Sequence, residues 1–149
     1  MKINECMCNN VFSVKPNCKV EEAVNLMRDN HIGCVAVCDD SNSIVGILTD
    51  RDILLRTVAC NKDVKTTPIS DVMTCNVCTC NPEDEVCEAE NKMGKNQIRR
   101  IPVVDNNNKL VGMLTMGDIA RFDNQLGKEN VSTTISNICD CHGSVKNAE

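Results

Sequence analysis

Two short segments of the chain contain a threonine and an aspartate at a spacing that can bind a nucleotide. In "VGILTDRDI" Thr49 stands three residues before Asp52, and in "VGMLTMGDI" Thr115 stands three residues before Asp118. An aspartate in the first turn of a helix can accept hydrogen bonds from both vicinal hydroxyls of a ribose, while the threonine and the helix N-terminus can meet a phosphate. The same spacing is typical of a capping box, in which the aspartate returns to the N–H of the cap residue. The two roles are compatible, and the local sequence leaves both open.

The two segments belong to a longer internal repeat. Aligning Gly46 with Gly112 gives an offset of 66 residues. The match then runs without a gap over about fifty positions, which indicates a duplication. We therefore expect two copies of one unit, packed around a pseudo-twofold axis.

Hydrophobic periodicity gives the order of elements within each copy. In the second copy a short β segment precedes Pro82. The segment "PEDEVCEAENKMGKNQ" predicts a helix whose inward face consists of Val86, Ala89, Glu90 and Met93. The runs "IRRIPVVD" and "KLVGMLT" predict two strands joined by the turn cluster "DNNN". A helix capped by Thr115 follows, with Ile119, Ala120 and Phe122 directed inward. The unit is therefore β-α-β-β-α.

This order predicts an α/β (α+β) fold made of tandem repeats and a short C-terminal helix. We expect the first repeat at residues 1–60, a linker at 61–70, the second repeat at 71–126, and a C-terminal helix and tail at 127–149.

Composition excludes several classes of function. The net charge of -5 and the absence of Trp and Tyr argue against nucleic-acid binding and against an anionic membrane surface. No apolar run approaches the ~20 residues that span a bilayer, and "MKINECMCNN" lacks the apolar region of a secretory signal. We expect a cytoplasmic protein with reduced thiols. The chain also has no phosphate loop and no nucleophile elbow, so we do not expect an enzyme.

The repeated segments "IRRIPVVDNNNKLVGMLTMGDIAR" and "IGCVAVCDDSNSIVGILTDRDILLR", with "VMT" opening the second copy, resemble the cystathionine-β-synthase (CBS) domain family. The resemblance covers residues 3 to about 125 and implies a regulatory module without a required cofactor. Tandem pairs of this family bind adenosine-containing ligands, namely AMP, ADP, ATP, S-adenosylmethionine or NAD, in two clefts between the copies. They usually form homodimers and signal to an effector protein through a change of shape or packing, and this chain's effector is unknown.

The resemblance also implies which residues face each other. Thr49 and Asp52 of one copy should face the second strand of the other copy, at Ile98, Arg99, Arg100 and Pro102. Thr115 and Asp118 should face Ile32, Gly33, Cys34 and Ala36. Adjacent arginines can clamp a phosphate, although they can also be an exposed strand edge. We expect the Asp52 site to prefer phosphorylated nucleotides and the Asp118 site to be weak, empty or open to a less charged adenosyl ligand, with some compensation from His31 and Arg121.

With few aromatic residues available, adenine should lie between aliphatic groups. The candidates are Val11, Ile47, Val77, Ile98 and Met113. Each of them singly can equally be ordinary core.

The cysteines support an alternative function. A metal or thiol-redox site could use Cys75, Cys78, Cys80, Cys139, Cys141 and His142. However, Cys78 and Cys80 align with Phe12 and Val14 of the first copy, which favours thiols packed as small hydrophobic groups.

Dimerisation is expected from the family resemblance. The candidate interface consists of apolar helix residues, Ile53, Leu54, Leu55, Ile119 and Phe122.

Overall fold

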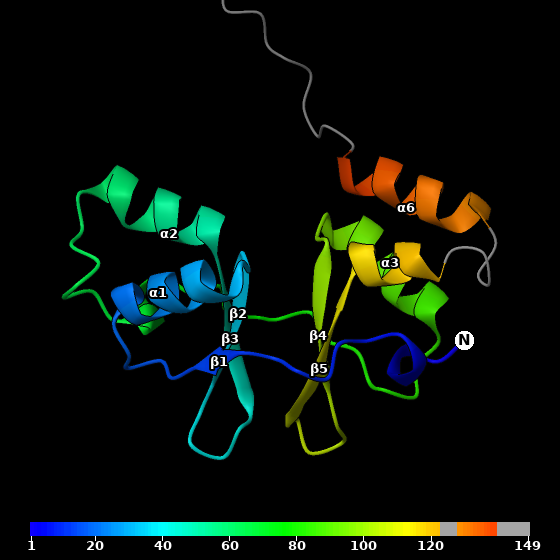
Figure 1. The fold of residues 1–149 in the computed structure, drawn as a ribbon, viewed down its shortest axis with the longest axis horizontal. Helices are drawn as coiled ribbons and strands as arrows, with labels where there is room; N and C mark the ends of the chain where they lie inside the picture. Colours follow the sequence, from blue (N-terminus) through cyan, green and yellow to red (C-terminus); the bar gives the residue numbers. More distant parts are fainter. Residues whose placement is uncertain (123–127, 140–149) are drawn as a thin grey trace, which may run out of the picture.

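The computed structural model describes residues 1–122 and 128–139, with the side chains of 128–130 left out. The first half contains β1 (Ser13–Val14), α1 (Val20–Asn30), β2 (Cys34–Cys38), β3 (Ile44–Thr49) and α2 (Asp50–Arg56). The second half contains α3 (Val86–Asn96), β4 (Arg100–Val104), β5 (Leu110–Thr115), α4 (Met116–Arg121) and α6 (Lys128–Cys139). Short 3-10 turns lie at η1 (Ile3–Glu5), η2 (Val58–Cys60) and η3 (Ile69–Asp71). The two halves stand side by side with their strands at the centre (Figure 1). The predicted mixed α/β repeat with a C-terminal helix is confirmed.

Each repeat builds a small sheet around one hairpin. In the first repeat β1 runs parallel to β2, and β2 is antiparallel to β3. In the second repeat β4 is antiparallel to β5, and the predicted first strand is reduced to a single parallel bridge between Cys80 and Val103. The register places Cys34 opposite Thr49 and Arg100 opposite Thr115. The first residues of the two hairpins therefore lie beside the two threonine caps.

Contacts between the halves occur in reciprocal pairs, as a pseudo-twofold axis requires. The Asn42 side-chain amide donates to the carbonyl of Leu110 at 3.2 Å, and Asn108 donates to the carbonyl of Ile44 at the same distance. These four residues are related in pairs by the repeat offset. The duplication read in the sequence is therefore also a symmetry of the packing between the two repeats.

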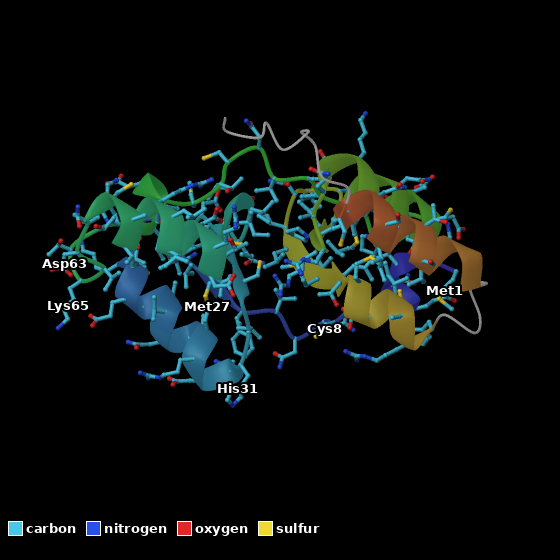
Figure 2. The ribbon with its side chains drawn as sticks, turned by 90° about the horizontal axis from the view of Figure 1, so that it is seen from above. Met1, Cys8, Met27, His31, Asp63 and Lys65 are labelled. Carbon is cyan, nitrogen blue, oxygen red and sulfur yellow. The ribbon has the colours of Figure 1, made fainter. Side chains whose placement is uncertain are left out.

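The leading segments of the two repeats, residues 1–8 and 67–74, are exchanged. The first leading segment packs on the second repeat, where the Val86 N–H donates to the carbonyl of Met1 and Ile3 is buried in the core. The second packs on the first repeat, where the Val20 N–H donates to the carbonyl of Thr67 and Ile69 is buried in the core. In Figure 2 Met1 lies beside the second repeat, while Asp63 and Lys65, just before the second leading segment, lie beside α1. Each core is thus completed by residues from the other repeat.

The helices bury the stripes that their spacing predicts. In α3 the buried residues are Val86, Ala89, Glu90 and Met93, the set expected from the sequence. Helix α6 lies against α3 in Figure 1. It approaches closely at Gly94, where an added Cβ would stand 3.2 Å from the Cβ of Asn137.

Two expectations about helix faces are wrong. Ile53 and Ile119 belong to the hydrophobic cores, so neither is an exposed interface residue, because the short helices α2 and α4 have to anchor themselves to their sheets. Leu54 and Leu55 are exposed as expected, and Phe122 is half-buried. Ala120 is exposed rather than directed inward. Of the helices that the structure describes, none is long and apolar enough to cross a membrane.

Candidate functional site

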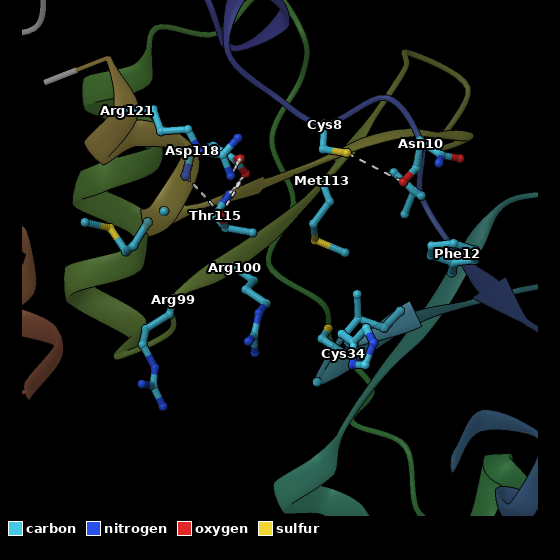
Figure 3. Close-up of a pocket in the computed structure, with 16 residues that line it drawn as sticks. Cys8, Asn10, Phe12, Cys34, Arg99, Arg100, Met113, Thr115, Asp118 and Arg121 are labelled. Atoms are coloured by element: carbon cyan, nitrogen blue, oxygen red, sulfur yellow. Dashed lines mark hydrogen bonds and ion pairs between the residues drawn. The ribbon is translucent and has the colours of Figure 1, made fainter. Parts of the chain in front are cut away.

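Two pockets lie at the seam between the repeats. The Asp52 pocket has a volume of about 420 Å³ and contains Thr49, Asp52, Val77, Ile98 and Pro102 in its wall. The Asp118 pocket has a volume of about 560 Å³ and contains Val11, Ile32, Met113, Thr115 and Asp118 in its wall (Figure 3). Both volumes fall in the range of roughly 300–1,000 Å³ that holds small ligands and cofactors. Both pockets draw their walls from both repeats.

A capping box fixes the aspartate of the first pocket. The Thr49 N–H donates to Asp52 Oδ2 at 3.0 Å, and the Asp52 N–H donates to Thr49 Oγ1 at 3.1 Å. Asp52 Oδ1 lies 3.3 Å from the Arg56 guanidinium, and Thr74 Oγ1 donates to Oδ1 at 3.4 Å. The capping role that the sequence left open is present. The carboxylate is held at the start of α2, in the wall of the pocket.

The second pocket repeats this arrangement with different neighbours. Thr115 and Asp118 form the same reciprocal pair of bonds, at 3.0 and 3.1 Å, and Thr115 Oγ1 also donates to Asp118 Oδ2 at 2.7 Å. Arg121 lies 3.2 Å from Asp118 Oδ1, but its side chain is 76% exposed. An ion pair with so exposed an arginine contributes little, so a ligand hydroxyl can replace it.

The facing walls contain most of the residues expected from the sequence. Arg99 and Arg100 line the Asp52 pocket beside Ile98 and Pro102. Ile32, Gly33 and Cys34 line the Asp118 pocket together with His31 and Arg121. Ala36 lines neither pocket. It is fully buried, because every residue of β2 is buried and Ala36 lies in a cluster with Cys38, Ile44 and Val104.

The arginine pair, Arg99 and Arg100, differs from the expectation in one respect. The sequence assigned both residues to the Asp52 pocket alone, but they line both pockets. Figure 3 shows Arg99, which directly precedes β4, and Arg100, the first residue of β4, among the side chains that line the Asp118 pocket. The reason is the pseudo-twofold axis, which brings the first residues of β2 and β4 close together. Placement of the arginines therefore does not by itself distinguish the two pockets.

Apolar groups form the remaining walls. The Asp52 pocket is lined by Ile47, Val77, Ile98 and Pro102. The Asp118 pocket is lined by Val11, Phe12, Ile32 and Met113. Sequence reasoning missed several further lining residues: Cys8, Asn10, Phe12, Thr74, Asn76, Asn96 and Gln97. The repeat offset was a usable signal for some of them, because Asn10 and Asn76 are equivalent positions and line opposite pockets.

Cys34 stands where the two pockets meet. It is a lining residue of both and lies in β2 directly after Gly33. Burial raises the pKa of its thiol to about 11, and the nearby Asp52 and Asp50 add to this, while Arg100 acts in the opposite direction. The thiol is therefore protonated at neutral pH, and it contributes a small apolar surface to the junction of the pockets.

The cysteines proposed for a metal site do not gather into one. Cys75 is exposed, Cys78 is half-buried in the wall of the Asp52 pocket, and Cys80 is buried with its sulfur 3.6 Å from Lys92 Nζ. Cys139 is exposed on α6, and Cys141 and His142 lie outside the described residues. Within residues 1–122 and 128–139, no group of three His, Cys, Asp or Glu side chains is arranged to hold a metal ion.

Comparison with known proteins agrees with the duplicated fold. The family model of the CBS domain matches residues 3–58 and 69–124. The chain therefore belongs to the CBS domain family and carries two CBS repeats. It is 38% identical over 136 residues to the CBS domain-containing protein YhcV of Bacillus subtilis, covering 91% of this chain and 94% of that protein.

Solved structures of CBS domain pairs are similar to the whole arrangement. The CBS domain pair of protein MJ0100, in complex with 5′-methylthioadenosine and S-adenosyl-L-methionine, matches with a TM-score of 0.76 and 28% identity over 85% of this chain and 98% of that one. CBSX2 in complex with AMP matches with a TM-score of 0.73 and 27% identity, covering 84% and 97%. Hypoxic Response Protein I, with two coordinated zinc ions, matches with a TM-score of 0.75 and 30% identity, covering 81% and 98%. CBS pairs of this fold thus bind adenosine-containing ligands.

Proposed function

We propose that this chain is a regulatory module that binds an adenosine-containing ligand in the Asp52 and Asp118 pockets. AMP, ADP or ATP is favoured, and NAD or S-adenosylmethionine is also compatible. The observation that carries the proposal is a carboxylate fixed by a capping box in each pocket, opposite an arginine pair. The adenosine ligands named for MJ0100 and CBSX2 support the same ligand class.

Each part of a nucleotide has a matching group in the pocket. The capped carboxylate accepts hydrogen bonds from the two ribose hydroxyls, which are donors. The arginine pair binds phosphate oxygens through its planar guanidinium groups. Adenine lies between aliphatic side chains, Ile47, Val77 and Ile98 in the Asp52 pocket and Val11, Ile32 and Met113 in the other.

The two pockets differ at the first turn of the helix that follows the threonine. The Asp52 pocket has Arg51 in that turn, whereas the Asp118 pocket has Gly117 at the equivalent position. Each pocket is lined by three arginines, but Arg121 of the Asp118 pocket is paired with Asp118, whereas Arg51 forms no ion pair among the described side chains. Arg51 therefore favours phosphorylated nucleotides in the Asp52 pocket. The Asp118 pocket then binds them more weakly or takes a less charged adenosyl ligand.

The module acts in the cytoplasm as a homodimer and transmits binding by a change of conformation or assembly. Because the walls of both pockets come from both repeats, a ligand contacts both and can bias their relative position. The shift is limited to the difference between the ligand's affinities for the two arrangements. An effector protein of unknown identity receives the signal.

Isothermal titration calorimetry tests the proposal with AMP, ADP, ATP, NAD and S-adenosylmethionine, on protein first shown to be free of carried-over nucleotide. We expect saturable binding of at least one ligand. Asp52→Ala should weaken the tighter nucleotide event at least about tenfold, since hydrogen bonds to charged groups contribute about 1.5–3 kcal/mol. Asp118→Ala should leave that event in place.

A matched control separates binding from folding. Asp29→Ala removes an aspartate on α1 that pairs with the neighbouring Arg28 and lines neither pocket. It should bind like the wild type, and thermal melts by circular dichroism should show all three variants folded. If folded wild-type protein gives no heat with any of the five ligands, the proposal is wrong and the aspartates are helix caps only.

A further inference from the structure

The two pockets have three lining residues in common, Cys34, Arg99 and Arg100. The pseudo-twofold axis explains why. Arg100 occupies the position in β4 that Cys34 occupies in β2, and each stands opposite a cap threonine across its hairpin. Arg100 reaches the other strand, since its guanidinium lies 3.7 Å from the position that a Cβ would take on Gly33. The two pockets therefore meet at the arginine pair.

Only one of the two equivalent strands supplies arginines at this junction. The positions equivalent to Arg99 and Arg100 are Gly33 and Cys34, an uncharged pair. Among the side chains that the structure describes, no carboxylate forms an ion pair with either arginine. The arginine pair is therefore available to a ligand, but a single pair faces two pockets.

The other charged groups in the pockets do not provide each with its own phosphate site. In the Asp52 pocket Arg51 is accompanied by Asp50 and Asp52. In the Asp118 pocket Arg121 is engaged with Asp118. Without the arginine pair, neither pocket has an excess of guanidinium over carboxylate groups. Each pocket thus depends on the same two cations to neutralise a phosphate.

We infer that the two pockets compete for the arginine pair, so that a phosphorylated nucleotide in one pocket lowers the affinity of the other for a second phosphorylated nucleotide. An uncharged adenosyl ligand does not need the arginines and binds the second pocket without this penalty. The inference rests on the proposed function and specifies its regulation. The state with the pockets occupied by one nucleotide and one uncharged adenosyl ligand is then preferred over the state with two nucleotides.

The competition is electrostatic in origin. Phosphates bound from both sides of one arginine pair repel each other across a short distance, and each receives part of the attraction that one alone would receive. By thermodynamic linkage, the same factor acts in both directions. We expect the second ADP to bind about tenfold more weakly than it would bind the same pocket with the other pocket empty. This factor lies within the usual range of coupling between sites. The factor should shrink at high ionic strength, because salt screens interactions across partly exposed pockets.

Calorimetry with ADP on pocket-blocked variants separates competition from an intrinsic difference between the pockets. Val77→Trp fills the apolar part of the Asp52 pocket, and Val11→Trp fills the equivalent part of the Asp118 pocket, in both cases without a change of charge. Blocking the tighter pocket should leave one ADP site about tenfold tighter than the second binding step of the wild type. Blocking the weaker pocket should leave the tight step at its wild-type affinity.

A second set of variants tests the arginines themselves. With Arg99→Gln and Arg100→Gln together, blocking one pocket should no longer change the ADP affinity of the other. Arg28→Gln is the matched control, since Arg28 lies on α1 and pairs with Asp29. It should keep the wild-type coupling factor. Adenosine binding by each variant serves as the check that the open pocket is folded.

The outcomes are distinguishable from failure of the proposed function. If ADP binds the weaker pocket of the variant with the tighter pocket blocked no more tightly than in the second binding step of the wild type, the pockets are independent and the inference is wrong. If the weaker pocket takes no ADP even when the tighter one is blocked, the arginine pair does not serve it and the inference is also wrong. If no adenosine ligand binds the wild type at all, the proposed function itself has failed.

Discussion

Cys34 shows at the scale of one residue how the fold and the site depend on each other. It lies in a fully buried strand and also at the junction of the two pockets. Burial raises the pKa of the thiol to about 11, with a smaller lowering effect from Arg100 and smaller raising effects from Asp52 and Asp50. A thiol in this state packs like a small hydrophobic side chain and is a poor nucleophile.

This pKa gives a prediction for stability at alkaline pH. The unfolded thiol ionises near 9.0, whereas the folded thiol keeps its proton until about 11. Between these values the unfolded state binds fewer protons, so the free energy of unfolding falls as the pH rises, by about 2 kcal/mol for this group. Cys34→Ala should lose less stability between pH 9 and 11, measured by urea unfolding. Cys75→Ala, at an exposed thiol, should follow the wild-type curve. If the free energy of unfolding fell equally with pH in the wild type and in Cys34→Ala, the raised pKa of Cys34 would be contradicted.

Most residues of the candidate site were predictable from the sequence. The sharing of Arg99 and Arg100 between the two pockets was not. The repeat offset locates Thr49, Asp52, Thr115 and Asp118 at equivalent places, because a threonine cap and its aspartate are fixed by local backbone geometry. Whether an arginine faces one pocket or two depends on how closely the strands approach the symmetry axis, which no local pattern encodes. Ala36 was placed in the Asp118 pocket by the family resemblance, but β2 is buried on both faces, so Ala36 packs inside the protein instead.

The exchange of the leading segments is the main feature at the scale of elements. An alignment of the two repeats is the same whether a leading segment packs on its own repeat or on the other, so the sequence does not reveal the exchange. The structure resolves it through the core, where Ile3 lies among second-repeat residues and Ile69 among first-repeat residues. Both side chains are fully buried. The two repeats are therefore joined by their cores as well as by the linker.

A pair of equivalent substitutions tests the exchange. Ile3→Ala should destabilise the protein by about 2–5 kcal/mol, the usual cost of such a cavity, and should speed amide hydrogen exchange in α3 more than in α1. Ile69→Ala should cost a similar amount but loosen α1 more than α3. Mass spectrometry of exchange in peptides from the two helices measures both effects. Faster exchange mainly in α1 for Ile3→Ala would mean that each leading segment packs on its own repeat.

At the scale of the whole molecule the two repeats present unlike outer surfaces. On the second repeat α6 packs against α3, and its Val131 enters the core. On the first repeat Leu54 and Leu55 of α2 are 56% and 45% exposed, and Val58 is exposed just beyond them. The positions equivalent to the two leucines are Ala120 and Arg121, which are less apolar. The leucines are thus a property of the first repeat alone.

This asymmetry leads to a prediction about the homodimer that we propose. A twofold dimer uses the same patch on both subunits, so an exposed leucine pair on one repeat favours association of first repeat with first repeat. Leu54→Lys should convert the dimer to a monomer of 16.4 kDa, because a lysine on each subunit would have to be buried opposite its twin. Light scattering after size exclusion at micromolar concentration measures the mass. Ile135→Lys is the matched control, since Ile135 is similarly exposed but lies on α6, and it should leave the dimer intact. A monomeric wild type would contradict the dimer, and loss of the dimer in Ile135→Lys alone would place the interface on the second repeat.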